Sequence, residues 1–211
     1  MFMMSDFQKK YWPSAPAYNG KRVMWLGDSI TAGATYQEDV LVWTGMTQDA
    51  QYAVGGRVSA DFDKDNAGTL LIAADFATTD VVHLLHGGND FGVALGTIAD
   101  AYVGSPATTF YNVIFQLYTR IRVLKPTVEI VASSMLNTSA ALNGYGNSRA
   151  EYAQAIADVL ALFSNTLAID LLTDCLITPA NAGTTTSDGV HPNALGGQMV
   201  ARGIANAMNA A

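Results

Sequence analysis

The chain has 211 residues, half of them hydrophobic and 14% charged, which is typical of a packed globular protein. The net charge of −7 arises from 18 acidic and 11 basic residues without a long run of one sign, so we expect no nucleic-acid partner. The lone Cys175 excludes an internal disulfide, and one cysteine with three histidines is too few for the usual structural zinc sites. We therefore expect neither a metal nor an organic cofactor.

The first twenty residues are broken up by prolines and end at Gly20, which predicts an N-terminal extension over 1–20 and one domain over 21–211. No basic leader with a sustained apolar core is visible. We therefore expect either a protein that stays inside the cell or one whose leader was removed. No apolar run approaches the roughly 20 residues of a transmembrane helix, and the sequence carries no marker of oligomeric state.

Five short apolar runs predict strands that are buried on both faces, as in a parallel sheet. The first three end in glycine-rich polar turns. In chain order the predicted strands are Arg22 to Leu26, Ala50 to Gly56, Asp80 to Asp90, Thr127 to Ser134 and Leu167 to Leu172.

Helical periodicity fills the intervals between the later strands. Apolar residues recur at spacings of three and four from Phe110 to Leu124 and from Tyr152 to Phe163. A last helix is predicted through Leu195, Met199, Ile204 and Met208, and Pro192 suits its first position. Alternating strands and helices predict a three-layer α/β/α sandwich with a flavodoxin-like parallel sheet of about five strands. In such sheets ligands bind at the carboxyl ends of the strands.

Candidate catalytic residues fall at these strand ends. A serine nucleophile needs a base, usually a histidine oriented by a carboxylate. His191 has Asp188 three residues before it, whereas Ser29 follows the first strand directly. Each motif alone also suits a structural role, because Asp188 can cap a helix and Gly-Asp-Ser is common turn chemistry.

The conjunction and order of the motifs are more specific than any one of them. The blocks Gly27-Asp28-Ser29, Gly55-Gly56, Gly87-Gly88-Asn89-Asp90 and Asp188-Gly189-Val190-His191-Pro192 resemble the four blocks of the GDSL/SGNH hydrolases. The resemblance spans nearly the whole chain and implies a serine esterase. It implies that Ser29 is the nucleophile, His191 the base and Asp188 the orienting acid.

The resemblance also implies an oxyanion hole formed by the Ser29 amide, the Gly56 amide and the Asn89 side chain. Gly55 is an alternative to Gly56 for the second donor. Many family members have an asparagine shortly before this glycine, whereas this chain has Gln51-Tyr52-Ala53-Val54. Arg57 could contact a negatively charged or hydroxyl-rich substrate, although the sequence favours a surface arginine beside a turn.

The triad does not choose a substrate. The turn Ala53-Val54-Gly55-Gly56-Arg57 is similar to that of sugar acetylesterases, and no long acyl groove is evident, so we expect a carbohydrate O-acetylesterase acting on short acyl esters. A lipid esterase, lysophospholipase or thioesterase of the same family is the alternative. A non-catalytic flavodoxin-like binding module also remains open, because a fold does not determine function.

Overall fold

The computed structural model describes residues 17–86, 88–102, 108–139 and 141–211. One sheet of five parallel strands has the order β2-β1-β3-β4-β5, the flavodoxin-like arrangement. This confirms the predicted sheet. The strands are β1 (Arg22–Gly27), β2 (Thr47–Ala53), β3 (Val81–Leu85), β4 (Glu129–Ser133) and β5 (Thr166–Ile169).

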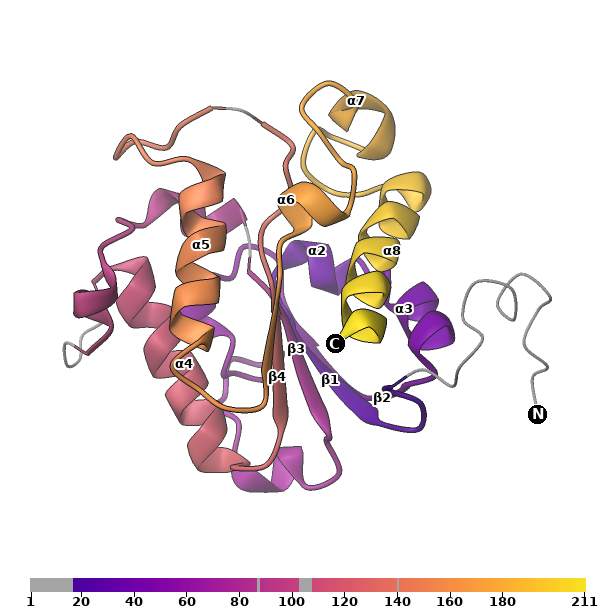
Figure 1. Cartoon of the computed structure of the whole chain (residues 1–211), viewed down its shortest axis with the longest axis vertical. Helices are drawn as coiled ribbons and strands as arrows, with labels where there is room; N and C mark the ends of the chain where they lie inside the picture. Colours follow the sequence, from indigo (N-terminus) through magenta and orange to yellow (C-terminus); the bar gives the residue numbers. More distant parts are fainter. Residues whose placement is uncertain (1–16, 87, 103–107, 140) are drawn as a thin grey trace.

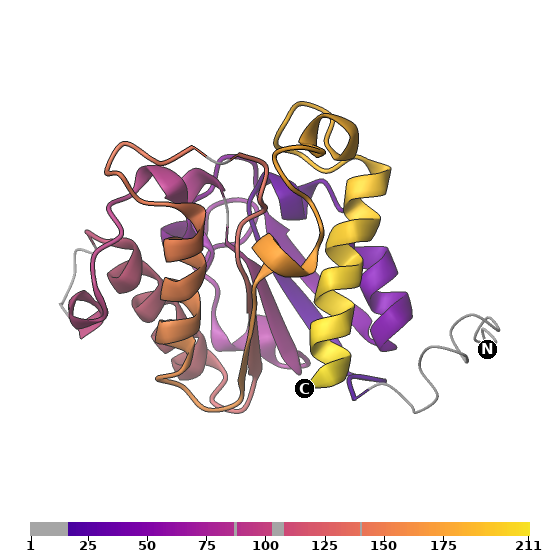
Figure 2. The same ribbon diagram turned by 45° about the horizontal axis from the view of Figure 1, so that its top comes forward.

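Helices cover both faces of the sheet, which gives the expected three layers. Helices α3 and α8 lie on one face, and α4 and α5 on the other (Figures 1 and 2). Each layer of helices packs on its own cluster of buried apolar side chains. The helices are α2 (Ser29–Ala32), α3 (Gln37–Thr44), α4 (Phe110–Leu124), α5 (Arg149–Leu160), α6 (Leu171–Asp174), α7 (Ala182–Thr185) and α8 (Ala194–Ala210). Short 3₁₀ helices are η1 (Ser59–Asp61), η2 (Ala73–Phe76), η3 (Gly88–Gly92) and η4 (Ile98–Tyr102).

The two edge strands differ from the prediction of burial on both faces. Strands β1 and β3 are almost entirely buried, whereas β2 is largely exposed or half-buried because it has a neighbour on one side only. Strand β2 also begins earlier than predicted, at Thr47, and ends before the glycine pair. The predicted fifth strand ends at Ile169, because Asp170 caps α6 by accepting a hydrogen bond from the Leu172 amide.

The three long predicted helices are present, with changes at their ends. Helix α5 begins at Arg149 because Ser148 and Glu151 form a capping box. Helix α8 begins at Ala194 with Asn193 as its N-cap. Pro192 therefore precedes the cap, and its predicted position at the start of the helix is wrong by two residues.

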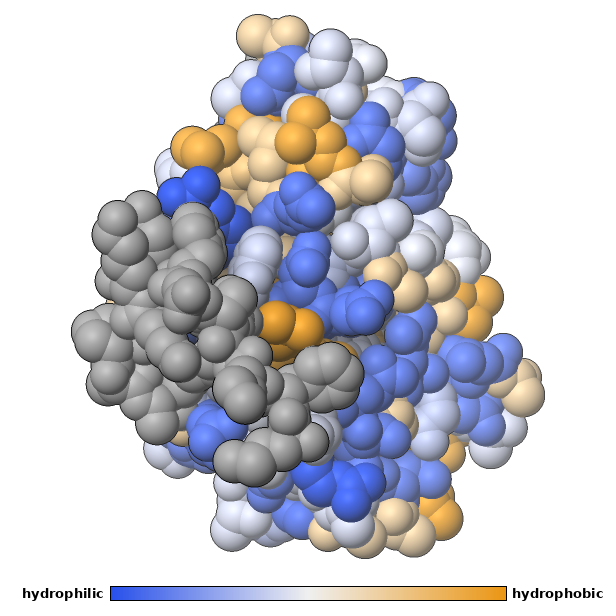
Figure 3. Space-filling view, turned by 90° about the vertical axis from the view of Figure 1, so that its right-hand side faces the viewer, coloured by the Kyte–Doolittle hydropathy of each residue, from blue (hydrophilic) through white to orange (hydrophobic). Residues whose placement is uncertain are grey.

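The predicted N-terminal extension, 1–20, is described only from residue 17 onward. Tyr18 is buried against the sheet layer that α3 and α8 cover, and its hydroxyl donates to the Glu129 carboxylate. The domain boundary after residue 20 stays a prediction. Among the described residues that are visible from this side of the molecule, hydrophilic ones predominate, and the largest hydrophobic group lies in the upper half of the view (Figure 3). No helix in the described part of the chain is long and apolar enough to span a bilayer.

Candidate active site

The turn after β1 presents Ser29 at the carboxyl edge of the sheet. Strand β1 ends at Gly27, where a Cβ atom would collide with the Thr31 side chain, so only glycine allows the chain to turn this closely. Asp28 is the N-cap of α2, and its Oδ1 accepts a hydrogen bond of 2.9 Å from the Ile30 amide. Ser29 is then the first residue of α2 and is only partly buried.

Asp188 and His191 occupy one short turn before α8. Asp188 Oδ1 accepts hydrogen bonds from the amides of Val190, at 2.9 Å, and His191, at 2.8 Å. Asp188 Oδ2 lies 2.6 Å from His191 Nδ1. The His191 amide and ring and the Val190 amide together lower the pKa of Asp188 to about 2, so this carboxylate is ionised near neutral pH. It can only accept, and His191 Nδ1 must therefore carry the proton.

The same imidazole faces the serine from a distant part of the chain. His191 Nε2 lies 2.8 Å from Ser29 Oγ, across 162 residues of sequence. Because Nδ1 is the donor toward Asp188, the neutral ring presents an unprotonated Nε2 to the serine hydroxyl. The structure thus brings Ser29, His191 and Asp188 into one hydrogen-bonded chain.

Asn89 lies in η3, after β3, and lines the same pocket as Ser29. Its Nδ2 donates to the Arg57 carbonyl oxygen at 2.9 Å and to Asp28 Oδ2 at 3.3 Å, which fixes the amide beside the serine turn. Burial raises the pKa of Asp28. The preceding glycine of this block, Gly87, lies outside the described residues.

The glycine turn after β2 borders the serine as well. Gly56 has a φ of +81°, which glycine adopts readily. A Cβ atom built on Gly55 would lie 3.8 Å from Ser29 Cβ, whereas one on Gly56 would meet nothing within 4 Å. Gly55 therefore lies beside the serine, and the choice between Gly55 and Gly56 as amide donor stays open.

Arg57 points its guanidinium toward its own loop. Nη1 donates to the Lys64 carbonyl at 2.8 Å, and Nη2 donates to the Asp65 carbonyl. Its side chain holds the segment after the glycine turn, and it is not among the described residues that line the serine pocket. A role in substrate binding stays a prediction for Arg57.

The other two histidines are fully buried. His86 Nδ1 lies 2.6 Å from Ser59 Oγ and its Nε2 lies 2.7 Å from the Tyr118 hydroxyl, while Ser59 Oγ donates to Asp90 Oδ2 at 2.8 Å. Burial lowers the pKa of both His83 and His86 to about 3. Neither imidazole approaches Ser29, and both support the sheet and its loops.

Asp90 also connects two loops of the site. Its Oδ1 accepts a 2.8 Å hydrogen bond from the Ser59 amide. The segment that carries Asn89 is thereby tied to the segment that follows the glycine turn. This agrees with a bracing role for Asp90 rather than a reacting one.

The pocket around Ser29 has a volume of about 250 Å³. Sequence reasoning did not single out the wall opposite the triad, which Met135, Leu136, Thr138 and Arg149 form. One signal was available, because Ser148 and Glu151 have capping-box spacing, and helices in a parallel α/β fold begin at the edge where the strands end. This signal predicts that the first turn of α5 lies at the edge of the sheet that carries the site.

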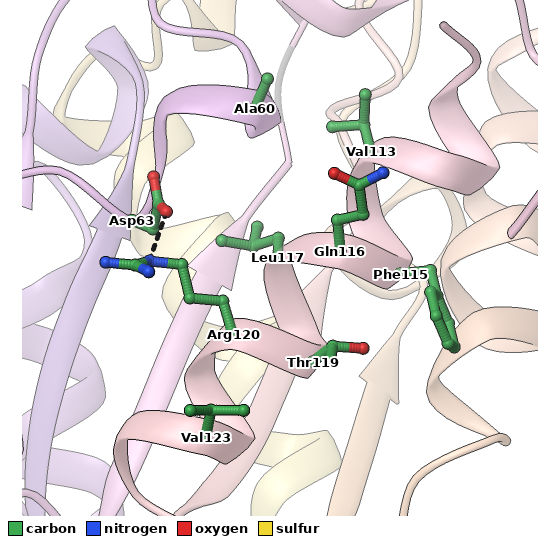
Figure 4. Close-up of a pocket in the computed structure, with 9 residues that line it drawn as sticks. All are labelled: Ala60, Asp63, Val113, Phe115, Gln116, Leu117, Thr119, Arg120 and Val123. Atoms are coloured by element: carbon green, nitrogen blue, oxygen red, sulfur yellow. Dashed lines mark ion pairs between the residues drawn. The ribbon is translucent and has the colours of Figure 1, made fainter. Parts of the chain in front are cut away.

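A larger pocket, of about 450 Å³, lies elsewhere, along α4 and η1. Its side chains include an ion pair between Asp63 and Arg120 of 2.7 Å (Figure 4). None of the predicted catalytic residues lines it. Within the described ranges, no cluster of His, Cys, Asp and Glu has the arrangement of a metal site.

A parallel sheet of this order, with serine, histidine and aspartate hydrogen-bonded at its carboxyl edge, is the arrangement of an SGNH-type hydrolase. A sequence profile of the GDSL-like lipase/acylhydrolase family matches residues 25–199. The chain therefore belongs to the GDSL-like lipase/acylhydrolase family. No curated protein matches it at significant similarity.

Several solved structures share the fold. A protein from Lactobacillus plantarum is 25% identical with a TM-score of 0.67, over 89% of this chain and 96% of that one. A protein described as a possible lipase from Chitinophaga pinensis is 18% identical with a TM-score of 0.67, over 88% of this chain and 96% of its own. An acetylxylan esterase from Geobacillus stearothermophilus, crystallised as a catalytic mutant, is 15% identical with a TM-score of 0.58, over 90% of this chain and 94% of its own.

Proposed function

We propose that this protein is a serine esterase in which Ser29 is the nucleophile, His191 the general base and Asp188 the orienting acid. The observation that carries the proposal is the unbroken chain from Ser29 Oγ to His191 Nε2, at 2.8 Å, and from His191 Nδ1 to Asp188 Oδ2, at 2.6 Å. A nucleophile within hydrogen-bond reach of a base that a third group orients is the signature of covalent acyl transfer.

The reaction follows from this geometry. Ser29 Oγ attacks the ester carbonyl carbon while its proton passes to His191 Nε2, and the resulting imidazolium is stabilised by the ionised Asp188. The imidazolium then protonates the leaving alcohol, and an acyl-enzyme remains on Ser29. Water gives a proton to His191 as it attacks the acyl carbon, and the imidazolium then returns this proton to Ser29 Oγ as the bond between Oγ and the acyl carbon breaks and the acid leaves. No step requires a metal or an organic cofactor.

Three donors are available for the oxyanion that develops during each attack. We assign these to the Ser29 amide at the first turn of α2, the Asn89 side chain and the Gly56 amide, with Gly55 as the alternative to Gly56. Asn89 Nδ2 has two hydrogens, which it donates to Asp28 and Arg57, so it donates to the oxyanion by giving up the longer of these bonds, the 3.3 Å bond to Asp28. Fixed donors of this kind commonly contribute a factor of about 10²–10³ each to the rate.

For the substrate we propose short acyl esters of carbohydrates. A pocket of about 250 Å³ suits a small group better than a long acyl chain. The acetylxylan esterase from Geobacillus stearothermophilus shares the fold, and the glycine turn at Gly55-Gly56-Arg57 is similar to that of sugar acetylesterases. A lipid esterase, lysophospholipase or thioesterase is the alternative within the family.

The test is hydrolysis of p-nitrophenyl acetate and of longer p-nitrophenyl esters by the native chain and by Ser29→Ala. We expect acetate to be cleaved fastest and the variant to lose at least about 10³-fold in kcat, because the nucleophile is gone. Ser164→Ala is the matched control, since Ser164 is exposed and precedes β5, at the edge of the sheet opposite to the triad. A preference for long acyl chains would reject the acetylesterase, and inertness toward every ester would reject the esterase.

A further inference from the structure

Arg149 occupies the pocket that contains Ser29 and His191, and its guanidinium is fixed there. The group lies over the Phe91 ring, 4.6 Å from its centroid. Its Nε donates to the Ser139 carbonyl at 3.1 Å, and Nη1 lies 3.1 Å from the Met135 sulfur. A long side chain held by three contacts has already lost most of its rotamer freedom, so it is prepared for binding before any ligand arrives.

This cation has no acidic partner among the described residues. The ion pairs of the described chain do not include Arg149, and its Nη2 makes no hydrogen bond there. The acid in the same helical turn, Glu151, is instead bonded to the amide and hydroxyl of Ser148. Arg149 also stands at the N-terminus of α5, where the helix dipole disfavours a positive charge.

The remainder of the pocket emphasises this charge. Of the described residues that line it, Arg149 is the only arginine or lysine. The one acid of this lining, Asp28, accepts hydrogen bonds from the Ile30 amide and from Asn89 Nδ2. A half-buried, unpaired guanidinium is unfavourable for folding alone, which points to a partner that arrives with the substrate. Guanidinium groups bind carboxylates in a planar, two-point geometry that lysine cannot reproduce.

We propose that Arg149 binds a carboxylate group of the ester that Ser29 attacks, so that the enzyme selects acidic esters over neutral ones. The inference rests on the proposed esterase function and specifies its substrate class. The carboxylate can belong to the acyl group or to the alcohol, for example a uronic acid. Both sources supply the same chemistry, and matched substrates distinguish them.

The experiment compares kcat/KM for two pairs of esters. p-Nitrophenyl hemisuccinate against p-nitrophenyl butyrate tests the acyl side, and acetylated galacturonate against acetylated galactose tests the alcohol side. We expect the acidic member of one pair to be preferred at least about tenfold. In Arg149→Gln this ratio falls to about one through a higher KM, whereas Arg202→Gln, which removes an exposed positive charge from α8, keeps it.

Equal kcat/KM within both pairs for the native enzyme would overturn the proposal. So would an Arg149→Gln variant that loses acidic and neutral esters in the same proportion, because that result describes a packing residue. Inertness of the native enzyme toward every ester would instead refute the esterase itself, so the two failures are distinguishable.

A second measurement uses the unaltered protein, since Arg149→Gln also removes the bond to Ser139. Hydrolysis of p-nitrophenyl acetate is followed in the presence of succinate or succinamide, and of galacturonate or galactose. We expect one of the two anions to inhibit competitively, at least about tenfold more strongly than its neutral counterpart. Equal inhibition by the charged and neutral compounds of both pairs would contradict a carboxylate site.

Discussion

Ser59 connects the segment after the glycine turn to the segment that carries Asn89 and Asp90. Its amide and hydroxyl both donate to Asp90, and its Oγ also bonds to His86. Because the single hydroxyl proton goes to Asp90, His86 must donate from Nδ1 and accept the Tyr118 proton at Nε2. The hydrogen-bond direction is thus fixed through the whole buried network.

We predict that Ser59→Ala destabilises the protein by about 1–3 kcal/mol, because it leaves buried polar atoms of His86 and Asp90 without their partner. Urea titration of the native protein and of the variant measures this difference in the free energy of unfolding. We expect kcat for p-nitrophenyl acetate to fall as well, since Asn89 is adjacent to Asp90. The exposed Ser164→Ala should change stability by less than about 0.5 kcal/mol; an equally small effect of Ser59→Ala would show that the network is not stabilising.

At the scale of single residues, the sequence predicted contacts between residues that are close together in the chain. Asp188 and His191 are separated by two residues, so their pairing was readable from one turn. The Ser29 to His191 contact was accessible only through the family resemblance, because 162 residues separate the two. The sequence indicated Arg57 and not Arg149 as a substrate contact, because only the folded chain shows that Arg57 is bound to two carbonyls while Arg149 lines the pocket.

Among the elements, α8 places the histidine turn through close backbone contact. A Cβ atom at Gly196 would collide with the Thr185 carbonyl oxygen, in the segment that leads to Asp188. Asn193 accepts from the Gly196 amide at 3.1 Å and donates to the Thr184 carbonyl at 2.9 Å. The start of the helix and the catalytic turn therefore form one packed unit.

We predict that Gly196→Ala costs several kcal/mol of unfolding free energy, because the helix and the turn must separate to admit one methyl group. The same displacement should lower kcat, since His191 moves relative to Ser29. Gly183→Ala is the matched control: Gly183 is helical, and its Cβ would meet nothing within 4 Å. Thermal unfolding and kcat for both variants test the prediction, and a Gly196→Ala protein as active and stable as Gly183→Ala would refute it.

The elements that sequence predicted best were those with strong periodicity or continuous burial. Helix α4 lies where its apolar repeat placed it, and β3 is buried throughout. Strand β2 was misplaced at its start because Thr47-Gln48-Asp49 carries no apolar signal at a sheet edge. Helix α3 was not predicted, because its residues show little separation of apolar and polar faces.

For the whole molecule, the buried histidines predict sensitivity to acid. The pKa of His83 and of His86 is about 3 in the folded protein, compared with about 6.5 for an exposed histidine. Between these values the unfolded chain binds more protons than the native one, so stability falls as the pH falls from about 6.5 toward 3. Each histidine should lower the free energy of unfolding by about 2 kcal/mol between pH 7 and pH 5.

Urea unfolding at several pH values measures this slope. His83→Gln should remove about half of it, even if the variant is less stable at pH 7, because one of the two titrating rings is gone. Asp188 adds little between pH 7 and pH 5, since its carboxyl is ionised there both in the native state, with a pKa of about 2, and in the unfolded chain, with a pKa of 3.8. A free energy of unfolding that is constant between pH 7 and pH 5 would contradict the assignment.

The hydrogen bonds within the Asp188–His191 turn have a consequence for how the family can change over evolutionary time. The proposed acid and base lie within one four-residue segment, and hydrogen bonds from the amides of that segment set its internal geometry. An insertion or deletion on either side would move both groups together and leave their pairing intact. Mutations outside the turn can thus change the distance between His191 and Ser29 while the contact between Asp188 and His191 is kept. Only the contact with the serine then has to be restored by further mutations.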